Sequence, residues 1–207
     1  METITVPAQM NVCDLLLDEN VRQGRGGKVA VVCGECEVTY VELTELTARL
    51  ASGLAELGVL PEQRVLILLP DSVEFVAAYL GVMRLGAVAV PLNTLLKPAD
   101  YEYLLADSRA VALIAHADLL PNMLLDSQWL KHVIVVGQAE GRNWDQLLKA
   151  SDPKFPPLML SCDDAGFWLY SSGTTGFPKA TVHLHQDVLF CMNYGRGILA
   201  VDDTVRT

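Results

Sequence analysis

A run of hydroxyl, glycine and lysine residues between positions 170 and 179 is the part of this sequence best suited to chemistry. It reads YSSGTTGFPK and follows an apolar stretch. Its hydroxyl residues are Ser171, Ser172, Thr174 and Thr175, its glycines are Gly173 and Gly176, and its lysine is Lys179. Glycines let the backbone N–H groups approach an anion. Hydroxyls donate hydrogen bonds to phosphate oxygens, and lysine adds a compact positive charge. The run therefore predicts a polyphosphate-binding loop.

Two better-known phosphate motifs do not fit this run. A Walker A loop needs four residues between its glycines and a lysine directly after the second one. Here two residues separate Gly173 from Gly176, and Lys179 lies three positions further on. The dinucleotide fingerprint needs a third glycine, which is missing. A second glycine cluster at 24–27 follows no predicted strand, and we interpret it as a surface turn.

Composition restricts the class of protein. The 207 residues are 51% hydrophobic and 19% charged, which predicts one domain, or one and a part, with a sizeable core. A net charge of −10 argues against general nucleic-acid binding. No run of 18 apolar residues and no signal-peptide pattern occurs, so we expect no membrane span and a cytoplasmic protein. The five scattered cysteines do not form a disulfide framework.

Alternating strand and helix patterns must position the loop. Strands are expected at 28–33, 36–40, 64–70, 87–91, 111–115, 132–136 and 167–170. Helices are expected at 39–56, from Asp71 or Ser72 to about 85, from Pro98 to 107, at 118–125 and at 186–199, with a helical pattern already from Val182. The first two strands form a hairpin, and Thr39 with Glu42 forms a capping box. This order predicts an α/β fold with a layered, mostly parallel sheet, flanking helices and right-handed crossovers.

The loop resembles the phosphate-binding signature of the adenylate-forming superfamily. That group includes acyl-CoA synthetases, luciferases and nonribosomal adenylation domains, and its usual pattern is Ser-Gly-[Ser/Thr]-Thr-Gly-x-Pro-Lys-Gly. The sequence matches through Lys179 and departs at Ala180, where glycine is usual. Because alanine does not readily adopt a positive φ, this departure bears on the geometry at the end of the loop.

The resemblance covers the chain from about residue 11 to its end. Residues 38–43 resemble the opening hairpin and helix of the family, and residues 85–93 resemble a segment that ends in its proline-asparagine turn. Residues 24–29, 93–109, 130–136 and 163–187 are most similar to the benzoate–CoA ligase branch.

This resemblance implies an ATP-dependent acid–CoA ligase. In such an enzyme a carboxylate, here an aryl acid such as benzoate, attacks the α-phosphate of ATP, and CoA then displaces AMP from the acyl-AMP. The implied phosphate ligands are Ser171, Ser172, Gly173, Thr174, Thr175, Gly176 and Lys179, with Mg²⁺ sharing the charge of the β- and γ-phosphates. No catalytic residue can be assigned.

Family members are more than twice as long as this chain. The resemblance therefore implies a partial N-terminal AMP-binding domain over 1–207, with a first α/β subdomain at about 1–150. A second subdomain that carries the loop would begin at about 158–207, and the C-terminal domain would be absent. This piece alone is expected to be inactive, and the full-length enzyme is expected to form a homodimer if it associates. Two alternatives stay open: a non-catalytic nucleotide- or phosphate-binding module, and an α/β interaction domain.

Two further groups could suggest chemistry of their own. His183 and His185 lie at strand spacing, but no other ligand pattern accompanies them, so we expect no metal site. The family has a histidine near position 185, which implies packing or hydrogen bonding behind the loop. Cys33 and Cys36 have redox or half-zinc spacing, yet they fall at a predicted hairpin turn and no second pair exists. We interpret them as ordinary turn residues.

Overall fold

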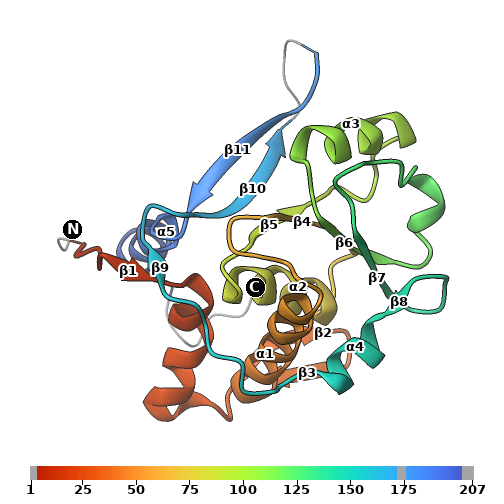
Figure 1. Cartoon of the computed structure of the whole chain (residues 1–207). Helices are drawn as coiled ribbons and strands as arrows, with labels where there is room; N and C mark the ends of the chain where they lie inside the picture. Colours follow the sequence, from red (N-terminus) through yellow and green to blue (C-terminus); the bar gives the residue numbers. More distant parts are fainter. Residues whose placement is uncertain (1–3, 172–175, 202–207) are drawn as a thin grey trace.

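The computed structural model of the chain, which describes residues 4–171 and 176–201, is built on a seven-stranded sheet (Figure 1). The strand order is β11-β10-β5-β4-β6-β7-β8, and every neighbouring pair is parallel except the antiparallel β10–β11 pair. The strands are β4 (Arg64–Leu68), β5 (Val88–Pro91), β6 (Ala112–His116), β7 (His132–Val136), β8 (Arg142–Asn143), β10 (Ala165–Ser171) and β11 (Lys179–Leu184). This architecture confirms the predicted α/β fold.

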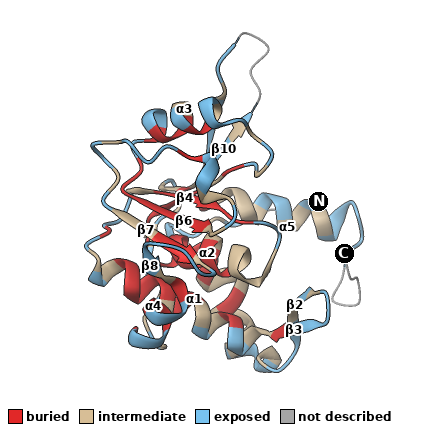
Figure 2. Ribbon diagram, turned by 90° about the vertical axis from the view of Figure 1, so that its right-hand side faces the viewer, coloured by how far each residue is buried: buried red, intermediate tan, exposed pale blue. Residues whose placement is uncertain are grey.

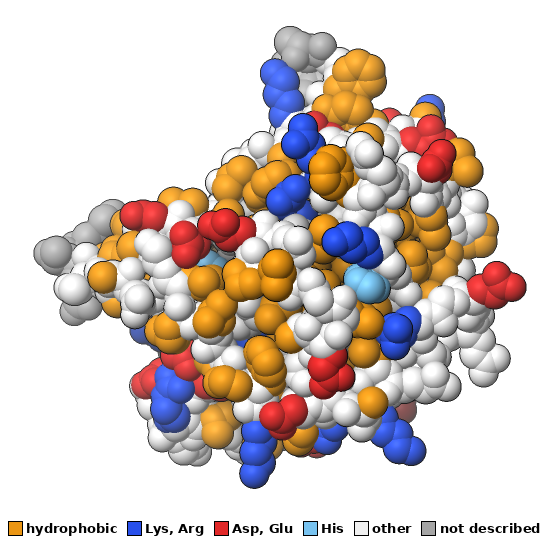
Figure 3. All heavy atoms as spheres, viewed as in Figure 1, with side chains coloured by type: hydrophobic (Ala, Val, Ile, Leu, Met, Phe, Trp, Pro, Cys, Tyr) orange, Lys and Arg blue, Asp and Glu red, His pale blue; other side chains and the backbone are white. Residues whose placement is uncertain are grey.

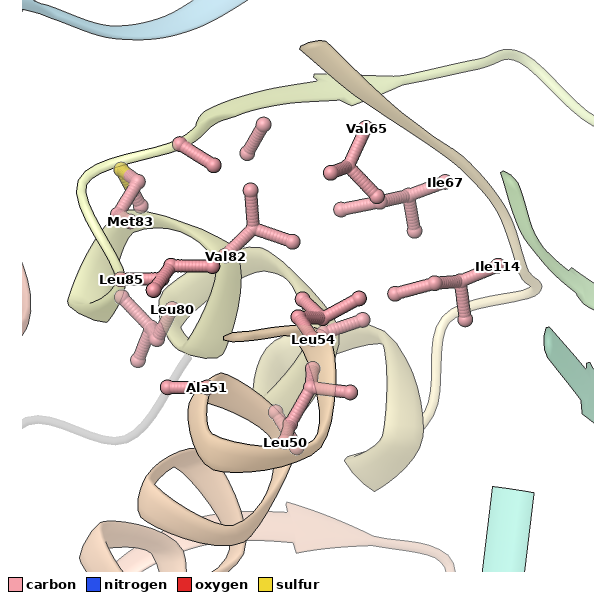
Figure 4. Packing of buried hydrophobic residues seen from close by; sticks show 14 of the residues in the cluster. Leu50, Ala51, Leu54, Val65, Ile67, Leu80, Val82, Met83, Leu85 and Ile114 are labelled. Carbon is pink, nitrogen blue, oxygen red and sulfur yellow. The ribbon is translucent and has the colours of Figure 1, made fainter. Parts of the chain in front are cut away.

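Side chains alternate across the central strands and fill two cores. Val65 and Ile67 of β4 face one core, and Leu66 and Leu68 face the other. All four are fully buried, as expected of a strand in a sheet that is covered on both faces (Figure 2). The first core also contains Ile114 of β6 and leucines of two helices (Figure 4).

Helices cover both faces of the sheet. The first core is covered by α1 (Tyr40–Glu56), α2 (Val73–Arg84) and α4 (Trp144–Ala150), and the second core is covered by α3 (Pro98–Ser108). The capping box before α1 is confirmed: Thr39 Oγ1 accepts from the N–H of Glu42, and the Glu42 carboxylate accepts from the N–H of Thr39 at 2.8 Å. Ser72 is the cap of α2 and accepts from Phe75 N at 3.2 Å.

Smaller elements complete the described part of the chain. The predicted hairpin is present as β2 (Val29–Cys33) and β3 (Cys36–Thr39), and all five cysteines are free thiols. Short strands β1 (Gln9–Met10) and β9 (Leu160–Ser161) pair antiparallel. Two π-helical segments, Asp14–Asp18 and Val21–Arg25, lead from β1 to the hairpin.

Two sequence-based expectations differ from the structure, and one helix had not been expected. Residues 118–125 form only a 3-10 turn at Leu120–Asn122, because Pro121 has no N–H and Met123 is extended and buried in the second core. The helical pattern expected from Val182 begins later, at α5 (Asp187–Gly197), because residues 179–184 pair with β10 as β11. Helix α4 was not expected at all.

Gly53 of α1 allows α4 to pack closely. A Cβ at this position would lie 2.8 Å from Leu147 Cδ1 and 2.8 Å from Ser151 Oγ. We expect Gly53→Ala to lower the free energy of unfolding by about 1–2 kcal/mol, because overpacking outweighs the gain in helix propensity. Urea denaturation would measure this change. The control is Gly195→Ala in α5, where a Cβ meets nothing within 4 Å, so that change should be neutral or stabilising. Equal effects of the two changes would contradict the packing argument.

Candidate phosphate site at the edge of the sheet

The hairpin of β10 and β11 carries the predicted phosphate loop. Because β10 runs parallel to β5, its carboxyl end emerges at the same edge of the sheet as the carboxyl ends of β4 and β5. The last paired positions are Tyr170 with Ala180 and Ser171 with Lys179. The described ends of β10 and β11 at this edge project past the rest of the sheet near α3 (Figures 1 and 2).

The predicted loop residues fall into two groups. Ser171, Gly176 and Lys179 are described and exposed, whereas Ser172, Gly173, Thr174 and Thr175 lie outside the described residues. Gly176 has a φ of 124°, a conformation that favours glycine. Ala180, in contrast, pairs with Tyr170 inside β11 and is not among the residues with positive φ. The departure from the family pattern at this position is therefore accommodated without strain.

A crevice lies at the same edge of the sheet. It has a volume of about 550 Å³ and opens where the chain leaves β4 toward α2 and leaves β5 toward α3. These two helices cover opposite faces of the sheet, so the crevice is a topological switch point, where open α/β sheets generally bind ligands. Its lining residues are Leu69, Pro70, Asp71, Phe75, Pro91, Leu92, Asn93, Thr94 and Leu169. Leu169 lies on β10 two residues before Ser171. Strand β10 therefore both lines the crevice and leads into the loop.

The two histidines lie toward the end of the hairpin opposite the loop, because His183 pairs with Phe167 whereas the loop follows the Ser171–Lys179 pair. The His183 ring stacks on Phe167 with a centroid distance of 4.6 Å. His185 is fully buried, and its Nδ1 accepts from the backbone N–H of Val12 at 3.2 Å. Burial lowers the pKa of His185, although nearby Asp164 opposes this shift. In the part of the chain that the structure describes, no three His, Cys, Asp or Glu side chains are grouped so that they could hold a metal ion.

Helix α3 contributes two contacts to this site that the sequence did not indicate. The hydroxyl of Tyr170 donates to Asp107 Oδ2 at 2.6 Å, and the rings of Tyr103 and Phe177 stack at 4.9 Å. The only available sequence signal is that Tyr103 and Asp107 are four residues apart, which places them on one helix face. Figure 3 shows basic and apolar side chains together at this end of the hairpin.

A polar loop and a crevice at the carboxyl edge of a parallel sheet are typical of nucleotide-binding α/β domains. A model of the family described as AMP-binding enzyme matches residues 17–205, so the chain belongs to that family.

Curated relatives and solved structures agree with this assignment. The chain is 38% identical to a benzoate–CoA ligase of Thauera aromatica, over 96% of this chain and 38% of the relative. It is 37% identical to a 4-hydroxybenzoate–CoA/benzoate–CoA ligase of Rhodopseudomonas palustris, over 91% of this chain and 36% of the relative. A benzoate CoA ligase from Burkholderia xenovorans LB400 superposes with a TM-score of 0.82 at 37% identity, covering 93% of this chain and 38% of that one. The structure of the anthranilate CoA ligase AuaEII in complex with anthranoyl-AMP superposes with a TM-score of 0.86 at 32% identity. The match covers 92% of this chain and 38% of AuaEII.

The chain thus spans less than two fifths of the length of these relatives. Within residues 4–171 and 176–201, none of the helices combines the length and hydropathy that crossing a bilayer requires.

Proposed function

We propose that this chain forms the N-terminal part of an ATP-dependent acid–CoA ligase that activates an aryl carboxylic acid such as benzoate. The observation that carries this proposal is the position of the loop: in a chain of the AMP-binding enzyme family, it lies at the carboxyl edge of the sheet beside the switch-point crevice. The named activities of the relatives support the choice of an aryl acid.

In the proposed reaction the carboxylate attacks the α-phosphate of ATP, which gives acyl-AMP and pyrophosphate. The thiol of CoA then displaces AMP and forms a thioester. The main physical task in the first step is to stabilise negative charge that develops on the leaving pyrophosphate. Mg²⁺ bound with the nucleotide would share this charge.

The loop would meet that task with donors and a positive charge. Ser171, Gly176 and Lys179 are exposed at the edge of the sheet, and they would supply a hydroxyl, a backbone N–H and an ammonium group. By resemblance, Ser172, Gly173, Thr174 and Thr175 would complete the cradle around the β- and γ-phosphates. Apolar side chains of Leu69, Phe75 and Leu169 give the neighbouring crevice walls of the kind that bind organic ligands.

We further propose that residues 1–150 form a first subdomain and that residues from about 158 begin a second one. Segment 158–201 adds β10, β11 and α5 to one side of the sheet. Because the chain covers 38% of the benzoate–CoA ligase relative, we do not expect it to form acyl-AMP by itself. Benzoate-dependent exchange of pyrophosphate into ATP would detect that activity.

Binding of MgATP to the 207-residue chain tests the proposed phosphate site. We expect titration calorimetry to show binding, and Lys179→Ala to weaken it about tenfold or more, because a charge-assisted contact to phosphate is lost. Lys154→Ala is the control, since Lys154 is also exposed but lies on the 151–157 connection away from the loop. If both variants bind like the unchanged chain, Lys179 does not contact the phosphates.

A further inference from the structure

Helix α3 is held rigidly by the second core. Tyr101, Leu104 and Leu105 are buried at about 1% exposure and pack with Leu66 and Leu68 of β4. The same helix presents Tyr103 and Asp107 to the hairpin, one helical turn apart. A fixed helix face therefore touches the hairpin at both sides of its loop.

The first contact is made at the end of β10. Tyr170, which directly precedes Ser171, donates its hydroxyl to the Asp107 carboxylate at 2.6 Å. Such charge-assisted hydrogen bonds are about twice as strong as neutral ones. The pKa of Tyr170 is raised mainly by burial and next by the hydrogen bond to Asp107. The phenol therefore stays protonated and remains a donor.

The second contact is made on the returning arm. Phe177 lies two residues before Lys179, and its ring stacks on Tyr103 at 4.9 Å with an interplanar angle of 21°. The side chain of Phe177 is 71% exposed, so burial in a core does not fix its position. Stacking on a residue of a rigid helix does restrict it, because aromatic pairs have preferred offsets.

We propose that Tyr103 and Asp107 are positioning residues, which fasten the two arms of the hairpin to α3 and so hold Ser171 and Lys179 where they bind phosphate. This inference rests on the proposed function. Its physical basis is that a loop ordered before binding loses less conformational freedom on binding. Neither residue touches the phosphates in this scheme; both act through Tyr170 and Phe177.

Calorimetry with MgATP on the 207-residue chain, combined with hydrogen exchange at residues 165–171 and 176–184, tests the proposal. The variants are Tyr103→Leu, Asp107→Ala and the conservative Asp107→Asn, whose amide oxygen can still accept from Tyr170. Glu102→Ala is the matched control, an exposed carboxylate on the same helix. Tyr170→Phe alone and with Asp107→Ala completes a double-mutant cycle.

We expect Asp107→Ala and Tyr103→Leu each to weaken MgATP binding about fivefold to tenfold and to speed exchange at the two arms. Asp107→Asn should recover much of the affinity, and adding Tyr170→Phe to Asp107→Ala should cost nothing more. The unfolding midpoint should match that of Glu102→Ala.

Affinity and exchange equal to those of Glu102→Ala would overturn the proposal. If the unchanged chain binds no MgATP, the proposed phosphate function fails in this chain, and the exchange data alone decide the role of α3. Faster exchange at the arms then supports the fastening of the hairpin, and unchanged exchange rejects it.

Discussion

Replacing Asp18 with alanine is expected to lower the free energy of unfolding by about 3–5 kcal/mol, because it leaves a buried guanidinium group without its carboxylate. The side chain of Arg84 is only 3% exposed, and its Nη1 and Nη2 donate to the two Asp18 oxygens at 2.8 Å. Burial is the largest single influence and by itself lowers the pKa of Arg84, but the hydrogen bonds and charge interactions with Asp18 and Cys13 together outweigh it and raise the pKa. Removing Asp18 takes away much of this compensation, so the guanidinium group stays buried without its carboxylate partner.

Urea denaturation would measure this loss against a matched control. Asp14→Ala also removes a carboxylate from the first π-helical segment, but its partner Arg22 is 53% exposed. That change should cost about 0–1 kcal/mol. Replacing both members of the buried pair, with Asp18→Leu and Arg84→Met, should restore much of the stability. If Asp18→Ala costs no more than Asp14→Ala, the buried pair does not stabilise the fold.

The second large effect is expected for Asn11→Leu, which should lower the free energy of unfolding by about 3–5 kcal/mol. Asn11 is 1% exposed and ties three segments together. Its Nδ2 donates to the carbonyls of Met83 and Leu158 at 2.8 Å, and its Oδ1 accepts from Cys13 N at 2.8 Å. Leucine has a similar size but removes the partners of the Cys13 N–H and the Leu158 carbonyl, at about 1–3 kcal/mol each. The Met83 carbonyl, in contrast, still accepts from Gly86 N at 2.9 Å.

The same change should loosen the junction between the N-terminal segment and residues 158–162. There β1 pairs with β9, and Cys162 N donates to the carbonyl of Ala8 at 3.1 Å. We expect faster hydrogen exchange in both segments of Asn11→Leu. Asn122→Leu, at an exposed position, should change stability by less than about 0.5 kcal/mol. A cost for Asn11→Leu within that range would show that backbone groups or water replace the lost bonds.

Local sequence patterns predicted most of the sheet correctly. The continuous apolar runs of β4, β6 and β7 fit strands buried on both faces, and Thr39 and Glu42 marked the start of α1 within one residue. The helix predicted at residues 118–125 was wrong. The leucines there have helical spacing, but Pro121 and the burial of Met123 impose a 3-10 turn. Strand β11 was missed because its pattern is half exposed and only pairing with β10 makes it a strand.

The sequence by itself determined the chemistry of the loop, from Ser171 to Lys179, and the alternation of strands and helices that carries it. Both depend on neighbouring residues, whose types restrict the backbone and supply donors wherever the chain folds. Only the tertiary structure decided that Asp107 accepts from Tyr170, 63 positions away, that Asn11 reaches Leu158, and that the loop lies beside the switch-point crevice. These contacts join segments far apart in the chain, and no local pattern specifies which faces meet when the sheet assembles.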